Sequence, residues 1–122
     1  MRLFVYGSLL SGESHHDHLG ASRLLGAAST EPVYTLVDLG PYPALLAGGT
    51  TSVSGEIYEV DADVLAALDD FEGHPDEYRR MPVRLIGDHG GGDVTETYVL
   101  PREKAAHARV IASGSWRGRA LR

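Results

Sequence analysis

The sequence contains no cysteine, which excludes disulfide bonds, thiolate metal sites and a cysteine nucleophile. It also lacks any apolar run near the roughly 18 residues of a membrane span, and its N-terminus reads as a strand rather than a signal peptide. Positive charge is scarce: 11 basic against 17 acidic residues give a net charge of −6. Because phosphate binding needs a basic surface, this balance disfavours nucleic acid as a partner. We therefore expect a cytoplasmic protein with neither nucleic acid nor membrane as partner.

The remaining composition, 43% hydrophobic and 23% charged, is typical of a globular protein. With 122 residues and no repeats or linkers, the chain is expected to form a single domain over residues 1–122, with a monomer as the default state. The pattern predicts strands at residues 3–6, 33–39, 44–47, 53–60, 81–86 and 94–100, with a closing strand or turn, including a docked Trp116, at 110–117. Six or seven strands with one good helix and one poorer one favour the α+β class: a small, mixed, mostly antiparallel β-sheet that curls or closes into a barrel.

The best-defined helix is predicted over residues 62–71. Asp61 is suited to cap its start, since its carboxylate can accept a hydrogen bond from a free backbone N–H group. Leu65, Leu68 and Phe71 recur at three-residue steps, which predicts one apolar face docked on the core.

Glu72 follows this face at the end of the helix, where Gly73 can adopt φ > 0 and stop it. The negative end of the helix dipole and the like charges of Asp69 and Asp70 favour a protonated carboxyl, so a raised pKa is expected for Glu72. A glutamate of this kind can take a proton near neutral pH. Acidic residues at a helix end are also common on solvated surfaces, and position alone leaves that alternative open.

Three other carboxylates compete for the role of base. Glu56 and Glu59 lie on an expected strand, away from any helix end or acidic neighbour, and Glu77 is expected to be exposed. All three therefore rank below Glu72.

Two further segments carry polar groups. Gly-Ser-Leu-Leu-Ser-Gly at residues 7–12 follows the first strand, where outward backbone N–H groups can hold a carboxylate or phosphate. His15, His16 and His18 with Asp17 include good Zn²⁺ ligands. Adjacent His15 and His16 point apart on a helix, however, so no metal site is predicted.

Five segments, taken together, carry a resemblance. They are residues 4–10 (Phe-Val-Tyr-Gly-Ser-Leu-Leu), 40–45 (Gly-Pro-Tyr-Pro-Ala-Leu), 53–60 (Val-Ser-Gly-Glu-Ile-Tyr-Glu-Val), 68–75 (Leu-Asp-Asp-Phe-Glu-Gly-His-Pro) with 78–80 (Tyr-Arg-Arg), and 114–117 (Gly-Ser-Trp-Arg). In their order and spread over nearly the whole chain they resemble the gamma-glutamylcyclotransferase-like family. The resemblance is to its short branch, which includes gamma-glutamylamine cyclotransferases and a cyclotransferase of aminoglycoside biosynthesis.

The resemblance implies a small β-barrel with flanking helices and a cavity at the end of the first strand. It also implies cleavage of a gamma-glutamyl amide, a small-molecule substrate, into 5-oxoproline and a free amine or amino acid. The family's catalytic glutamate falls on Glu72, and its substrate-binding residues fall on Tyr6, Gly7, Ser8, Leu9 and Tyr78.

The residue chemistry is sufficient for this reaction, because the substrate's own α-amine is the nucleophile and neither a metal nor a cofactor is required. Two alternatives stay open: a non-catalytic small-molecule-binding or interaction module on the same fold, and an amidohydrolase acting in the same pocket. The sequence also leaves open the leaving amine, and whether the N–H groups of residues 7–9 hold the substrate carboxylate or the oxyanion.

Overall fold

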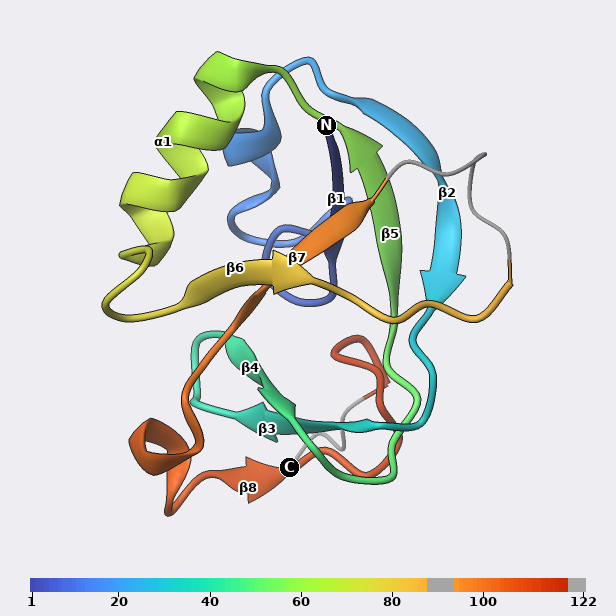
Figure 1. The fold of residues 1–122 in the computed structure, drawn as a ribbon, viewed down its shortest axis with the longest axis vertical. Coiled ribbons are helices and arrows are strands. Elements are labelled where there is room, and N and C mark those ends of the chain that lie inside the picture. The colour runs from blue at the N-terminus through green and yellow to red at the C-terminus, as the bar shows by residue number, and fades with distance from the viewer. Residues whose placement is uncertain (88–93, 119–122) are drawn as a thin grey trace.

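The computed structural model describes residues 1–87 and 94–118. Their strands and helices, in chain order, are β1 (Arg2–Val5), the 3₁₀ helix η1 (His16–Leu19), β2 (Arg23–Ser29), β3 (Tyr34–Asp38), β4 (Pro43–Ala47), β5 (Ser54–Glu59), α1 (Ala62–Glu72), β6 (Arg79–Pro82), β7 (Thr95–Val99), the 3₁₀ helix η2 (Arg102–Ala105) and β8 (Arg109–Val110). Across the described ranges, the eight strands form one sheet in the order β2-β5-β1-β7-β4-β3-β8, with β6 paired to β7. The helix α1 packs beside this sheet and contacts η1 (Figure 1).

Strand β7 is the branch point of the sheet. It pairs in parallel with β1 and with β4, and antiparallel with β6. The other pairings, β1 with β5, β2 with β5, and β3 with β4 and β8, are antiparallel. The described residues thus form a mixed, curled half-barrel with one α-helix, which confirms the predicted α+β fold class.

The core lies inside the curl of the sheet. Its fully buried side chains include Leu3, Phe4, Leu36, Leu45 and Leu68. Burial of each such side chain stabilises the fold by about 1.5–3 kcal/mol relative to leaving it in water. Trp116 is 2% exposed, as the predicted docking of this residue requires. Among the described residues, no helix is long and apolar enough to cross a membrane.

The predicted start of α1 is confirmed, and the helix ends at Glu72, one residue beyond the predicted range of 62–71. The Asp61 carboxylate accepts a hydrogen bond of 2.8 Å from the Val64 N–H group, which satisfies one free donor at the start of the helix. Gly73 ends the helix at φ 70°, and its N–H group donates to helix carbonyls.

The prediction for the apolar face of α1 is wrong at Phe71. Leu68 is fully buried and Leu65 partly so, but the Phe71 side chain is 41% exposed. The last turn of the helix extends past the core, and the Phe71 ring stacks on His18 of η1 at a centroid distance of 4.1 Å. The ring therefore forms part of the molecular surface.

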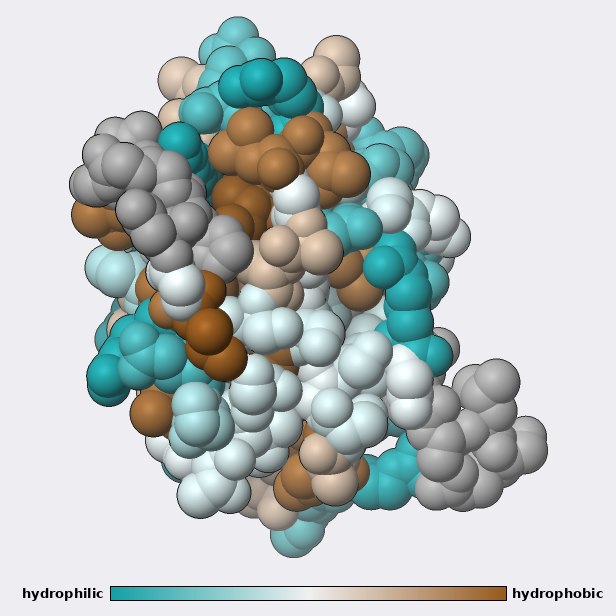
Figure 2. Space-filling model, turned by 90° about the vertical axis from the view of Figure 1, so that its right-hand side faces the viewer, coloured by the Kyte–Doolittle hydropathy of each residue, from teal (hydrophilic) through white to brown (hydrophobic). Residues whose placement is uncertain are grey.

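The strand β2 was not predicted, because most of its side chains are exposed and give no alternating hydrophobic pattern. Leu24 and Leu25 are among its exposed residues, and the face of the molecule in Figure 2 carries hydrophobic side chains among polar ones. The register with β5 shifts between Leu24 and Gly26, a bulge that also obscures the period of two. The loop predicted to join residues 86 and 94 lies largely outside the described residues.

Candidate active site

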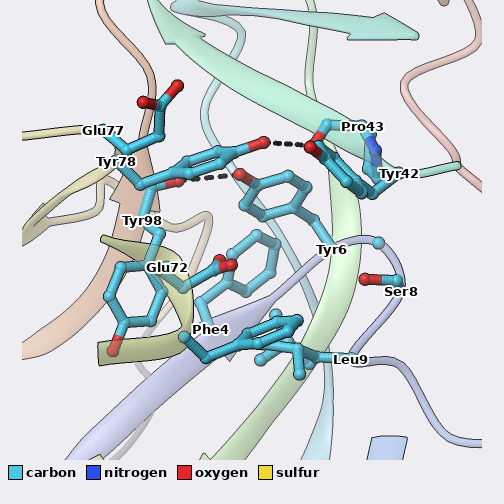
Figure 3. A pocket seen from close by; sticks show the side chains of 13 residues that line it. Phe4, Tyr6, Ser8, Leu9, Tyr42, Pro43, Glu72, Glu77, Tyr78 and Tyr98 are labelled. Carbon is cyan, nitrogen blue, oxygen red and sulfur yellow. Dashed lines mark hydrogen bonds between the residues drawn. The ribbon is translucent and has the colours of Figure 1, made fainter. Parts of the chain in front are cut away.

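A cavity of about 220 Å³ opens at the end of β1, bounded by the turn after that strand, the end of α1 and the segment that leads into β6. All six residues proposed from the sequence line it: Tyr6, Gly7, Ser8, Leu9, Glu72 and Tyr78 (Figure 3). The structure thus brings together two segments more than 60 residues apart in the chain. The volume of the cavity lies below the roughly 300–1,000 Å³ of pockets for drug-sized ligands, so the cavity suits a group of amino-acid size.

The turn after β1 passes close to the start of β4, and only glycine fits at its first position. A Cβ atom on Gly7 would lie 2.3 Å from Pro43 Cγ. The Leu10 N–H group donates to the Gly7 carbonyl at 3.0 Å, and the His15 N–H group donates to the Ser8 carbonyl at 2.9 Å. In the described part of the chain, the N–H groups of Ser8 and Leu9 have no protein acceptor. They are therefore available to an anionic group of a ligand.

Two tyrosine hydroxyls are fixed by the backbone around the cavity. The Tyr6 hydroxyl donates to the Tyr98 carbonyl at 2.7 Å and accepts from the Leu45 N–H group at 3.2 Å. The Tyr78 hydroxyl donates to the Pro43 carbonyl at 3.0 Å. Burial raises the pKa of Tyr6 and of Tyr78 above the ordinary value, and the charge of Glu72 adds to both increases. Both hydroxyls are therefore neutral donors near pH 7, and their rings act as walls of the cavity.

Glu72 is the last residue of α1, and its carboxylate points into the cavity among aromatic rings (Figure 3). No hydrogen bond to this carboxylate occurs within residues 1–87 and 94–118. Burial raises its pKa to about 7. The predicted direction is confirmed, but its main cause is desolvation and not the acidic neighbours.

Asp69 does not act as a like charge on Glu72 because it has its own partner. The Asp69 carboxylate accepts two hydrogen bonds from the Arg80 guanidinium, at 2.9 and 3.1 Å, and one of 2.8 Å from the Tyr98 hydroxyl. Burial opposes ionisation of Asp69, but these hydrogen bonds outweigh it and lower its pKa. Arg80 also pairs with Glu96, so this half-buried cation ties α1 to β6 and β7.

Sequence reasoning missed Tyr98, which lines the cavity beside Glu72 (Figure 3). A tyrosine in a strand is compatible with any half-buried position, and nothing in its neighbours indicates the cavity. Its place depends on the pairing of β7 with β6 and β1, which local patterns do not encode.

The competing carboxylates are engaged or exposed. The Glu56 carboxylate is hydrogen-bonded by Ser11 and Tyr58, and its pKa is lowered although burial acts the other way. Glu59 pairs with the N-terminal amino group at 2.5 Å. Glu77 lies at the edge of the cavity, exposed, with its carboxylate 3.5 Å from Lys104 Nζ. Glu72 is therefore the carboxylate best placed to exchange a proton inside the cavity.

The histidines near η1 contact aromatic rings and a backbone carbonyl. His15 and His18 pack against Phe71, while the His16 Nδ1 atom lies 2.9 Å from the Leu9 carbonyl oxygen. His15 and His16 thus face different partners, as expected for adjacent positions. Within the residues that the structure describes, no group of three or more His, Cys, Asp or Glu side chains could hold a metal ion.

Comparison with known proteins gives this arrangement its family. The family model described as "Gamma-glutamyl cyclotransferase, AIG2-like" matches residues 3–118. A protein of Vibrio cholerae, provisionally named a gamma-glutamylcyclotransferase, is 54% identical over 114 residues, which cover 93% of each chain. The gamma-glutamylaminecyclotransferase of Rattus norvegicus is 37% identical over 111 residues, covering 80% of this chain and 74% of that protein.

Solved structures agree with the fold. The solution NMR structure of protein ytfP from Escherichia coli superposes with a TM-score of 0.73 at 36% identity, covering 98% of each chain. The curled mixed sheet with its helix is therefore that of the gamma-glutamyl cyclotransferase-like fold. The chain belongs to the gamma-glutamyl cyclotransferase, AIG2-like family.

Proposed function

We propose that the protein is a gamma-glutamyl cyclotransferase that cleaves a gamma-glutamyl amide into 5-oxoproline and a free amine or amino acid. The observation that carries this proposal is the shared cavity, in which a buried, unpaired Glu72 lies with the free N–H groups of Ser8 and Leu9. Family membership and the naming of a relative as a gamma-glutamylaminecyclotransferase support it.

In the proposed complex, the glutamyl group enters the cavity and folds back on itself. The Ser8 and Leu9 N–H groups hold an anionic oxygen of the substrate, and the rings of Tyr6 and Tyr78 enclose its carbon chain. Ring closure is intramolecular, so holding the α-amine against the γ-carbonyl removes much of the entropic barrier, by several kcal/mol or more.

Glu72 acts in this proposal as general base and then as general acid. It takes a proton from the substrate's α-ammonium, whose nitrogen attacks the γ-carbonyl carbon. The new N–C bond closes the five-membered ring, and the old amide C–N bond breaks as Glu72 passes its proton to the departing nitrogen. The attacking nitrogen then gives up a second proton, which passes through the same carboxylate to the amine, so that 5-oxoproline is neutral at nitrogen and the amine leaves as an ammonium ion. A base with a pKa of about 7 suits both steps, and general acid–base catalysis of this kind contributes about 10²–10⁴ in rate.

The test is release of 5-oxoproline from a panel of gamma-glutamyl amines and gamma-glutamyl dipeptides, measured by chromatography. Glu72→Gln should retain the fold and lose at least about 10²-fold in kcat. Asp70→Asn is the matched control: it removes an exposed carboxylate two residues away on the same helix and should leave turnover unchanged. Near-normal turnover by Glu72→Gln would remove Glu72 from the catalytic role.

The products also separate the competing functions. Free glutamate in place of 5-oxoproline would indicate an amidohydrolase. Binding of a gamma-glutamyl amide by calorimetry, without product from any member of the panel, would indicate a binding module.

A further inference from the structure

The C-terminal Gly-Ser-Trp-Arg segment, residues 114–117, does not line the cavity, but it is hydrogen-bonded to β5, the strand that pairs with β1. The Ser54 N–H group, at the start of β5, donates to the Gly114 carbonyl at 2.8 Å. Gly114 has φ 72°, and a Cβ atom there would lie 2.1 Å from the Ser52 carbonyl oxygen, so the close approach requires glycine. Trp116 is 2% exposed, which anchors the segment in the core.

This anchorage places Arg117 against Ser11, which follows the Gly7–Leu9 turn and lies 106 positions earlier in the chain. The Arg117 Nη2 group donates to the Ser11 carbonyl oxygen and, at 3.1 Å, to the Ser11 hydroxyl. Its Nη1 atom lies 3.6 Å from Glu56 Oε2, and its Nε atom lies 3.8 Å from Glu13 Oε2. One guanidinium thus contacts both a backbone carbonyl and two carboxylates.

Glu56 also forms hydrogen bonds with Ser11. The Ser11 N–H group donates to Glu56 Oε1 at 2.9 Å, and the Ser11 hydroxyl donates to Oε2 at 2.8 Å. The Glu56 side chain is only 12% exposed, so these charge-assisted bonds are partly shielded from water. Ser11 is consequently fixed at its amide, its hydroxyl and its carbonyl.

We infer that Arg117 is a positioning residue, which with Glu56 holds Ser11 and thereby aims the N–H groups of Ser8 and Leu9 into the cavity. This inference rests on the proposed function for its effect on catalysis. Ser11 continues directly from the turn, so freeing it would let the two N–H groups change direction. Anion binding by backbone N–H groups depends on that direction. Glu72, in contrast, is held by α1 and does not contact the Arg117–Ser11–Glu56 cluster.

The test compares Arg117→Met with the wild-type protein on the best gamma-glutamyl amide of the panel. We expect KM to rise about tenfold while kcat changes less than about twofold, because binding is weakened and proton transfer by Glu72 is not. Arg117→Lys keeps the charge but loses the planar donors that span Ser11 and Glu56, so its KM should lie between the two. The Arg117 side chain is 45% exposed, and the melting temperature should stay within about 3 °C of wild type.

Arg109→Met is the matched control: Arg109 is also C-terminal and half-exposed, and pairs with one carboxylate, Asp38, at 3.2 Å. It should leave KM unchanged. Hydrogen exchange of the amides of residues 8–11 in the free protein gives a readout independent of activity, and it should be faster in Arg117→Met only.

Unchanged exchange in the turn, or a KM equal to that of the wild type, would overturn the inference. So would a loss of kcat that follows a fall in melting temperature, since that is a purely structural effect. Faster exchange in the turn of Arg117→Met, together with no turnover of any substrate by the wild-type protein, would support the positioning role of Arg117 and refute the proposed function.

Discussion

Replacing Glu72 by glutamine should make the protein more stable above neutral pH while removing its proposed base. The carboxylate is buried without a hydrogen-bond partner in the described structure, so its charged form is disfavoured in the fold. Glutamine has nearly the same shape and is always neutral. The variant therefore isolates the free energy of holding a charge at this position.

The size of the effect follows from the pKa of Glu72, which burial raises from 4.5 to about 7. Between these values the folded protein keeps the proton and the unfolded chain has lost it, so this group's contribution to stability falls as pH rises from 4.5 to about 7 and levels off above that. At about 1.4 kcal/mol for each pH unit of the interval, the contribution falls by about 3 kcal/mol. The free energy of unfolding of Glu72→Gln, minus that of wild type, should therefore increase by about 3 kcal/mol between pH 4 and pH 8.5.

The assay is urea unfolding of both proteins at several pH values, followed by fluorescence of Trp116. Paired carboxylates such as Asp69 also titrate, but they do so in both proteins and cancel in the difference. A difference that is constant with pH would mean that the pKa of Glu72 is the same in the folded and the unfolded protein, and would refute its assignment as a buried base.

Three further outcomes follow from the same geometry. The kcat/KM of the proposed reaction should rise with pH through an apparent pKa of about 7, because only ionised Glu72 accepts a proton; a pH–rate profile without that limb contradicts the assignment. Gly7→Ala should destabilise the protein by about 1–3 kcal/mol in denaturant unfolding, because its Cβ would overlap Pro43; an unchanged midpoint would show that the turn relaxes freely. Arg80→Met should lower the free energy of unfolding by about 3 kcal/mol in the same assay, because it leaves Asp69 ionised, partly buried and without its cation. Equal stability of the variant and the wild type at pH 7 would show that the Arg80–Asp69 pair adds nothing.

The elements that local chemistry specifies were predictable from the sequence. Asp61 marks the start of α1 because its carboxylate caps a free backbone N–H group of the first turn. Gly73 marks the end because glycine readily adopts the left-handed conformation that stops a helix. The same boundary places Glu72 at the last helical position. Its proximity to the Gly7–Leu9 turn came from the family resemblance and not from local pattern.

The features that depend on tertiary pairing were not predictable. Phe71 matches the helical period of the core, yet it lies beyond the edge of the core and stacks on His18. The raised pKa of Glu72 was expected from nearby charges, but Arg80 neutralises Asp69, and burial in the cavity causes the shift. In both cases the missing information is which distant element packs against the helix end.

The central place of β7 has a consequence for how the protein folds. The Tyr6 hydroxyl bonds to the Tyr98 carbonyl across 92 positions, and the Thr97 hydroxyl bonds to the Phe4 carbonyl across 93. The cavity is therefore incomplete until β7, which begins the last quarter or so of the chain, has paired with the first strand. Such a high contact order predicts folding on the millisecond-to-second scale, with the first strand unpaired on that side during synthesis until the ribosome has released β7.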